Sequence, residues 1–202
     1  MAATLTLVLG GARSGKSDLA ERLVLGYAGD GAAHYVATAV VDPADTDFAA
    51  RVAGHRARRG ERFRTVEAGD DLAACVRALP AEPALVDTLG TWLASPAVTP
   101  CWAGGLHRTD GDGTAGLDGP LDDLVAALTA RTAPTVVVSD ETGLGVHPEH
   151  DAGRHWRDAL GIVNQRVAAV AGDVWLVVAG RVLPLHEPSH FGLHDETHRG
   201  DG

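Results

Sequence analysis

The chain has 202 residues, of which 45% are apolar and 22% are charged, and its formal net charge is -10. This length and apolar content suit one globular domain with a buried core, and they exclude a fibrous or wholly disordered chain. The excess of acidic residues argues against binding DNA or RNA through a general basic surface, so any anion site must be locally basic.

The sequence predicts a soluble protein of a reducing compartment. Its two cysteines, Cys75 and Cys101, are too few for a disulfide framework and lack the spacing of a metal-binding pair. The N-terminal stretch MAATLTLVLGG has no basic residue before its apolar run, so we interpret it as a first strand rather than a signal peptide. The apolar runs are far shorter than the ~20 residues that a membrane helix needs. We expect a cytoplasmic protein without a membrane span.

Short apolar strands alternate with helical stretches along the chain. Runs rich in β-branched residues and leucine predict strands at Thr4–Leu9, His34–Ala39, Ala84–Val86, Thr135–Ser139, Val174–Ala179 and Arg181–Leu185. Apolar residues recur at helical spacing in Lys16–Tyr27, Asp45–Arg59, Asp70–Leu79, Leu121–Thr132 and Pro148–Ala171. Near-continuous apolar strands are typical of a parallel sheet covered on both faces. The alternation predicts an α/β domain of three layers with a mostly parallel sheet.

Two segments lie outside this alternation. Ser95–Pro120 is rich in Gly, Pro, Thr and Asp, and we interpret it as a long mobile surface loop or lid. The tail from His186 to Gly202 is polar and rich in histidine, so we expect it to be poorly ordered. The predicted organisation is therefore one catalytic domain over residues 1–185, followed by a tail over residues 186–202.

The residues after the first predicted strand match the pattern Gly-x-x-x-x-Gly-Lys-Ser of a phosphate-binding loop. They are Gly10, Gly11, Ala12, Arg13, Ser14, Gly15, Lys16 and Ser17. A strand enters this segment and a helix leaves it, as in P-loop NTPases, so that backbone N–H groups and the positive end of the helix face the phosphates. We expect Lys16, the one lysine of the chain, to contact the β- and γ-phosphates and Ser17 to bind Mg²⁺.

Two carboxylates follow predicted strands and are expected at the same edge of the sheet. Asp87 comes directly after the run Ala84–Val86, which makes it the candidate partner of Ser17 in holding Mg²⁺. An ordinary aspartate that caps the next helix would occupy the same place. Glu141 follows the run Thr135–Ser139 and is the second candidate for the same crevice.

The segment Arg51–Arg64, RVAGHRARRGERFR, is strongly basic within an acidic chain. It predicts a phosphate site, although arginines at a solvated helix end would give the same composition by complementing the helix dipole. His55 lies among these arginines, and neighbouring cations favour the neutral imidazole, the form that can attack phosphorus.

Together these segments resemble the bifunctional adenosylcobinamide kinase/adenosylcobinamide-phosphate guanylyltransferase family of cobalamin biosynthesis, over about residues 4 to 185. The motifs that carry the resemblance are Leu-Gly-Gly-Ala-Arg-Ser-Gly-Lys-Ser at 9 to 17, Tyr-Val-Ala-Thr-Ala at 35 to 39, His55-Arg56-x-x-Arg59, Phe63-x-Thr65-x-Glu67, Leu-Val-Asp at 85 to 87 with Trp92, Glu141-x-Gly-x-Gly, Asn164-Gln165-Arg166 and Asp173-Val-Trp-Leu-Val-Val-Ala-Gly.

The resemblance implies two reactions. In the first, ATP or GTP phosphorylates the aminopropanol hydroxyl of adenosylcobinamide. In the second, GMP passes from GTP through a guanylylated histidine, by motif match His55, to give adenosylcobinamide-GDP and pyrophosphate. The positions that correspond to GTP contacts of the family are Ala37, Thr38, Ala39, Arg56, Ala57, Arg58, Arg59, Glu67 and Asp87. A P-loop domain and a small homo-oligomer, a trimer, are also implied.

Two positions depart from the family pattern, because Asp140 and His150 stand where the family usually has asparagine. Two other functions compete with the favoured one. A kinase that does not transfer nucleotides would leave His55 a structural residue. A non-catalytic nucleotide switch or metal chaperone would use the tail histidines His186, His190, His194 and His198, although Pro188 and Gly192 interrupt the helix that would align them.

Overall fold

A computed structural model describes residues 4–39, 50, 53–54, 60–104 and 116–186. Its strands are β1 (Leu5–Gly10), β2 (Ala33–Ala37), β3 (Phe63–Glu67), β4 (Ala84–Asp87), β5 (Thr135–Asp140), β6 (Asp173–Val178) and β7 (Arg181–Leu185). Its helices are α1 (Lys16–Ala28), α3 (Leu72–Ala78), α4 (Leu89–Leu93), the 3-10 helix η1 (Thr99–Cys101), α5 (Asp118–Thr129) and α6 (Asp151–Ala168). Every predicted strand is present, with boundaries that differ by at most two residues.

The strands form one sheet in the order β3-β2-β4-β5-β1-β6-β7. All neighbouring pairs are parallel except β6 and β7, which form an antiparallel hairpin at one edge. The central strands β1 and β5 are almost completely buried, which explains why their sequences are apolar without alternation. The predicted α/β class with a mostly parallel sheet is confirmed.

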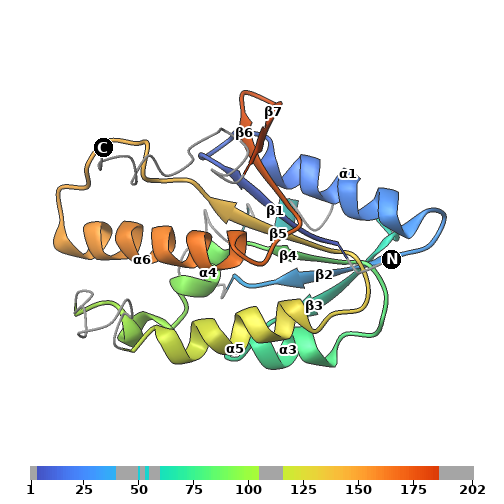
Figure 1. Ribbon diagram of the computed structural model, residues 1–202, viewed down its shortest axis with the longest axis horizontal. Coiled ribbons are helices and arrows are strands. Elements are labelled where there is room, and N and C mark those ends of the chain that lie inside the picture. The colour runs from blue at the N-terminus through green and yellow to red at the C-terminus, as the bar shows by residue number, and fades with distance from the viewer. Residues whose placement is uncertain (1–3, 40–49, 51–52, 55–59, 105–115, 187–202) are drawn as a thin grey trace, which may run out of the picture.

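Helices cover both faces of this sheet (Figure 1). On one face α1 packs through Ala20 and Val24 onto a buried cluster that includes Val8 and Val138. On the other face α3, α4, α5 and α6 enclose a larger cluster. The three layers hold the strand ends in a fixed relation to each other, and these ends form the candidate site.

In the described parts of the segment Ser95–Pro120, residues 95–104 and 116–120, several side chains are buried rather than exposed on a surface loop. Val98 and Trp102 are buried, the indole Nε1 of Trp102 donates to Leu93 O at 2.8 Å, and η1 lies between them. Leu117 is also buried, just before α5 begins at Asp118. These large apolar side chains anchor the two described parts, although most residues of the segment are polar or small. Residues 105–115, the middle of the predicted lid, lie outside the described part.

Besides η1, two elements were not expected from the sequence. β3 is an edge strand whose side chains are mostly exposed, so it has no apolar run to indicate it. α4 has only five residues, too few for helical periodicity. It begins at Leu89, after Thr88, whose side chain caps it by accepting a hydrogen bond from Gly90 N at 3.1 Å. Of the predicted helix Asp45–Arg59, the described residues 50, 53 and 54 have helical backbone.

Candidate active site at the carboxyl edge of the sheet

The predicted site residues Gly10 and Asp87 lie at the carboxyl edge of the sheet, where Asp140 also lies. In the strand register Gly10 of β1 lies beside Asp140 of β5, and Asp87 of β4 lies beside Val138 of β5. β5 therefore separates the strand that leads into the P-loop from the strand that ends at Asp87. This edge is where ligands of parallel α/β sheets bind.

The P-loop conformation depends on two of its glycines. A Cβ on Gly10 would lie 2.5 Å from Ser14 Oγ and 2.8 Å from Val177 O, so only glycine fits there. Gly15 caps α1 with a φ of 93°, in the left-handed region that favours glycine. Ser14 is buried and its carbonyl accepts a hydrogen bond from Gly180 N at 2.8 Å, so the β6–β7 turn supports the loop. Gly11, Ala12 and Arg13 form its exposed rim.

Lys16 begins α1 and points back across the loop. Its Nζ donates to Gly11 O at 3.3 Å and lies 2.8 Å from Asp140 Oδ1. The lysine side chain is 11% exposed, so its charge is largely shielded from solvent at the end of the strands. A lysine in this place can contact phosphate oxygens that enter the loop.

Ser17 and Asp87 lie together, as the sequence predicts. Ser17 Oγ donates to Asp87 Oδ1 at 3.4 Å, and the hydroxyl of Tyr35 donates to Asp87 Oδ2 at 2.6 Å. A serine hydroxyl and a carboxylate are the hard oxygen donors that Mg²⁺ prefers, and Mg²⁺ usually takes its other ligands from phosphates and water. The residues therefore fit the metal that a P-loop enzyme uses.

Threonine hydroxyls close the edge between β2 and β4. Thr38 Oγ1 donates to Thr88 O at 2.7 Å and accepts from Thr88 N at 2.9 Å, and it lies 2.6 Å from Thr91 Oγ1. These bonds join the end of β2 to the cap of α4. The cluster had no signal in the sequence, because Thr38 lies 50 residues before Thr88 along the chain.

The predicted GTP-contacting positions of β2 and β3 are neighbours in the sheet. Ala37 pairs with Asp87 on one side and with Glu67 on the other, and Thr38 and Ala39 follow directly. Glu67 is exposed at the end of the edge strand β3. These positions extend the candidate site from the P-loop side toward β3.

The other predicted GTP-contacting residues, and the proposed nucleophile, belong to the connection between β2 and β3. His55, Arg56, Ala57, Arg58 and Arg59 lie outside the described residues.

Two arginines of the basic segment form bonds near the amino ends of the strands, on the side of the sheet opposite the candidate site. Arg62 donates to Gly31 O at 3.0 Å, and Arg64 Nη1 lies 2.7 Å from Glu82 Oε2, which also contacts His34 Nε2 at 3.0 Å. Arg64 pairs with His34 near the amino ends of β3 and β2. The composition of Arg51–Arg64 predicts one phosphate site, but these two arginines stabilise the scaffold instead.

Glu141 lies beside the site, but its side chain accepts a hydrogen bond from its own loop. Its backbone N–H donates to Gly10 O at 3.1 Å, and its Oε1 accepts from Gly143 N at 2.7 Å. The carboxylate that reaches the P-loop lysine is Asp140, which sequence reasoning noted only as a departure from a family pattern. Its place at the end of an apolar strand was the available signal.

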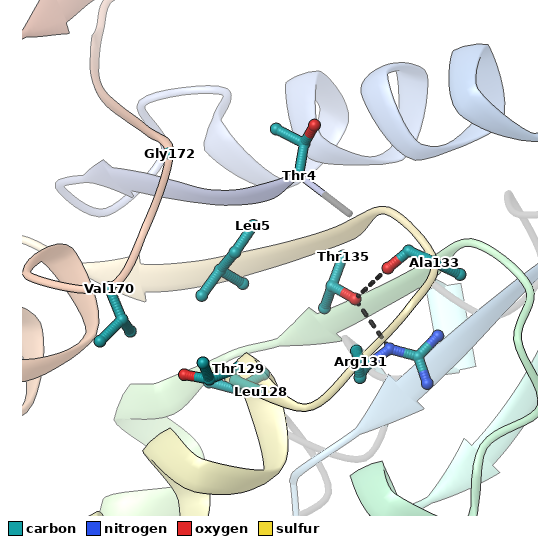
Figure 2. A pocket seen from close by; sticks show the side chains of 9 residues that line it. All are labelled: Thr4, Leu5, Leu128, Thr129, Arg131, Ala133, Thr135, Val170 and Gly172. Atoms are coloured by element: carbon teal, nitrogen blue, oxygen red, sulfur yellow. Dashed lines mark hydrogen bonds between the residues drawn. The ribbon is translucent and has the colours of Figure 1, made fainter. Parts of the chain in front are cut away.

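A separate pocket lies near the amino ends of β1 and β5 (Figure 2). Its polar wall is Arg131, whose Nε donates to Thr135 Oγ1 at 2.8 Å and whose Nη2 donates to Glu82 O at 2.6 Å. Burial lowers the pKa of the Arg131 guanidinium, and these bonds offset part of the desolvation cost. The guanidinium is thus bonded within the protein, and the pocket lies at the amino ends of the strands, away from the predicted site residues.

In the part of the chain that the structure describes, no group of three or more His, Cys, Asp or Glu side chains could hold a metal ion. His190, His194 and His198 of the tail lie outside that part. Among the helices described, none has the length and apolar content to cross a membrane.

Comparison with known proteins identifies the family. The family model "Cobinamide kinase / cobinamide phosphate guanyltransferase" matches residues 6–185. The bifunctional adenosylcobalamin biosynthesis protein CobU of Escherichia coli strain K12 is 37% identical over 180 residues, covering 86% of this chain and 95% of that protein. The corresponding CobP of Pseudomonas aeruginosa is 38% identical over 182 residues, covering 89% of this chain and 95% of that protein.

Solved structures resemble the chain more distantly. The P4 protein of bacteriophage phi6, in complex with ADP, has a TM-score of 0.42 at 17% identity and covers 89% of this chain and 52% of that one. The flagellar accessory protein FlaH of Methanocaldococcus jannaschii has a TM-score of 0.43 at 15% identity, covering 89% of this chain and 74% of that one. The sequence relatives carry the assignment: the chain belongs to the cobinamide kinase / cobinamide phosphate guanyltransferase family.

Proposed function

We propose that the chain phosphorylates the aminopropanol hydroxyl of adenosylcobinamide with ATP or GTP and then transfers GMP from GTP to that phosphate. The observation that carries the first half is the convergence of Lys16, Ser17 and Asp87 at one strand edge beside a P-loop. The second reaction, GMP transfer, is supported by the family to which the chain belongs. Both reactions break a phosphoanhydride bond, so both need an enzyme that binds a triphosphate.

In the kinase step the chain's own residues position and neutralise the triphosphate. The backbone N–H groups of the P-loop and the N-terminus of α1 surround the β-phosphate, and Lys16 spans the β- and γ-phosphates. The acceptor hydroxyl attacks the γ-phosphorus as the bond to the β-phosphate oxygen breaks. Little covalent chemistry is required of the protein, because positioning and charge stabilisation supply most of the rate.

Ser17 and Asp87 are the residues that would hold Mg²⁺. The ion, when bound, neutralises charge on the phosphate oxygens. Tyr35 fixes the orientation of the Asp87 carboxylate through its 2.6 Å hydrogen bond, so that the second carboxylate oxygen faces Ser17.

In the guanylyl step His55 is the proposed nucleophile. Its neutral imidazole attacks the α-phosphorus of GTP, an N–P bond forms, and the bond between the α-phosphorus and the bridging oxygen breaks to release pyrophosphate. The phosphate of adenosylcobinamide phosphate then attacks the same phosphorus and the N–P bond breaks. Arg56, Arg58 and Arg59 would offset the charge of the triphosphate and of the departing pyrophosphate.

The order of strands supports a GTP site toward β3. Ala37 and Glu67 lie at adjacent strand ends. The chain leaves the sheet after Ala37, and the connection that follows begins with Thr38 and Ala39 and contains His55. We also propose that the protein is a homotrimer of the cytoplasm, as the resemblance implies, and that its partners are the nucleotides and the corrinoid substrates.

Product analysis tests this function. The purified protein is incubated with Mg²⁺, adenosylcobinamide and either ATP or GTP, and the corrinoid products are identified by mass. We expect adenosylcobinamide phosphate with ATP alone, and adenosylcobinamide-GDP only when GTP is present. The variant Lys16→Ala should lose phosphorylation by orders of magnitude. The absence of any phosphorylated corrinoid would overturn the proposal, and phosphorylation without the GDP product would favour the kinase-only alternative.

A further inference from the structure

The lysine of the P-loop has an intramolecular anionic partner. Asp140 Oδ1 lies 2.8 Å from Lys16 Nζ, and the two side chains are only 25% and 11% exposed. Such a pair is screened less by water and salt than an ion pair on the surface. Lys16 therefore carries a charge that is largely compensated before any phosphate enters the loop.

The surroundings of Asp140 fix its carboxylate in this place. Its backbone pairs with Gly10 in the sheet, and its carbonyl accepts from Asn164 Nδ2 at 3.0 Å. Its second carboxylate oxygen, Oδ2, accepts from Thr88 Oγ1 at 3.3 Å. A Cβ on Gly90 would collide with this same oxygen, so the space for the carboxylate exists because residue 90 is glycine. Backbone, hydroxyl and glycine together hold Asp140 against Lys16.

This arrangement conflicts with the role of Lys16 toward a triphosphate. An ammonium that contacts Asp140 must turn to phosphate oxygens or share its donors with them. The γ-phosphate then lies near a fixed carboxylate of the same sign, and like charges at a distance of a few ångströms repel measurably even in a polar surrounding. A diphosphate ends one phosphate earlier and experiences less of this repulsion.

We propose that Asp140 competes with the γ-phosphate for Lys16, and so weakens the binding of nucleoside triphosphates more than that of diphosphates. Asp140 is then a specificity-determining residue that keeps Lys16 in position between turnovers and limits the affinity of the kinase site for its donor. This inference rests on the proposed nucleotide site at the P-loop.

The test is the isosteric change Asp140→Asn, which removes the charge. The amide keeps an oxygen that can accept from Lys16 and gains a nitrogen that can donate to Thr88 Oγ1. Dissociation constants are measured by calorimetry for β,γ-imido-GTP and for GDP, each with Mg²⁺. We expect the constant for the triphosphate analogue to fall about tenfold, and that for GDP to fall about threefold or less. In steady-state kinase assays KM for the donor should fall while kcat does not rise.

The matched control is Asp18→Asn, which removes one negative charge from the exposed first turn of α1. It should change both dissociation constants less than twofold. An unchanged or larger triphosphate constant in Asp140→Asn, with a native melting temperature, would overturn the inference. So would an equal change for both nucleotides. If the wild-type protein binds neither nucleotide, or if Lys16→Ala binds them equally well, the proposed nucleotide site itself fails.

Discussion

At the scale of single residues, only a few of the described side chains approach the place where phosphates are expected. Asp87 is central among them, since its two carboxylate oxygens accept from Ser17 and from Tyr35. The first contact serves the proposed metal site and the second orients the carboxylate. Substitutions can separate these two roles.

We expect Asp87→Asn to lower kcat of the kinase reaction by about 100-fold or more, because an amide keeps the shape but cannot supply the negative charge that holds Mg²⁺. Tyr35→Phe, which removes only the orienting hydroxyl, should lower kcat by about tenfold or less. Both are measured with saturating donor over a series of Mg²⁺ concentrations. Equal activity of Asp87→Asn and the wild type would remove Asp87 from the metal site.

The environment of Cys75 gives a second prediction at this scale. Burial raises the pKa of the Cys75 thiol, and the negative charge of Asp71 raises it further. A raised pKa means that less of the reactive thiolate is present at pH 8 than in a free cysteine. The variant Cys101→Ser leaves Cys75 as the one cysteine. At pH 8 iodoacetamide should react with Cys75 more slowly than with glutathione, and the rate of the reaction with Cys75 should still be rising above pH 9. A rate equal to that of glutathione at pH 8 would contradict this.

At the scale of elements, strands with continuous apolar runs were predictable and elements held by isolated contacts were not. β1 and β5 are buried on both faces, so their sequences alone indicate them. β3 and α4 lack such patterns, because one is an exposed edge strand and the other is very short. The segment 95–104 has the composition of a loop, and yet Val98 and Trp102 belong to the core.

The packing of Trp102 makes this correction testable. Trp102→Ala should lower the free energy of unfolding by about 3–5 kcal/mol, because a large buried side chain and its hydrogen bond to Leu93 O are lost. Leu144→Ala is the matched control, since Leu144 is 83% exposed and its loss should cost less than about 0.5 kcal/mol. Both are measured by urea unfolding. A similar small effect for the two variants would mean that Trp102 does not belong to the core.

At the scale of the whole molecule, the sequence was sufficient for the fold class and for the place of the P-loop. A strand, a glycine-rich turn and a helix are consecutive in the chain, so their pattern is visible in one dimension. The contact of Asp140 with Lys16 and the cluster of Thr38, Thr88 and Thr91 depend on strand order. Such contacts between distant segments carry no local signature, which is why reasoning from sequence missed them.

We expect the tail to be dispensable for the molecule as a whole. Deleting residues 186–202 should change the melting temperature by less than about 2 °C and leave kinase activity nearly unchanged, because this polar segment has little apolar surface to bury. Deleting residues 181–202 is the contrasting change, since it also removes β7 and its pairing with β6. That longer deletion should lower the melting temperature clearly. A comparable loss from the shorter deletion would show that the tail is part of the fold.

In the proposed function one chain carries two separable activities, one at the P-loop and one at His55. Wild-type protein and His55→Ala are incubated with Mg²⁺ and α-labelled GTP, and protein-bound label is measured after denaturation together with adenosylcobinamide phosphorylation by ATP. The wild type should carry acid-labile, base-stable label, and His55→Ala should carry none while its phosphorylation of adenosylcobinamide remains measurable. Guanylylation of His55→Ala at the wild-type level would contradict the account, because another residue would then carry the covalent step.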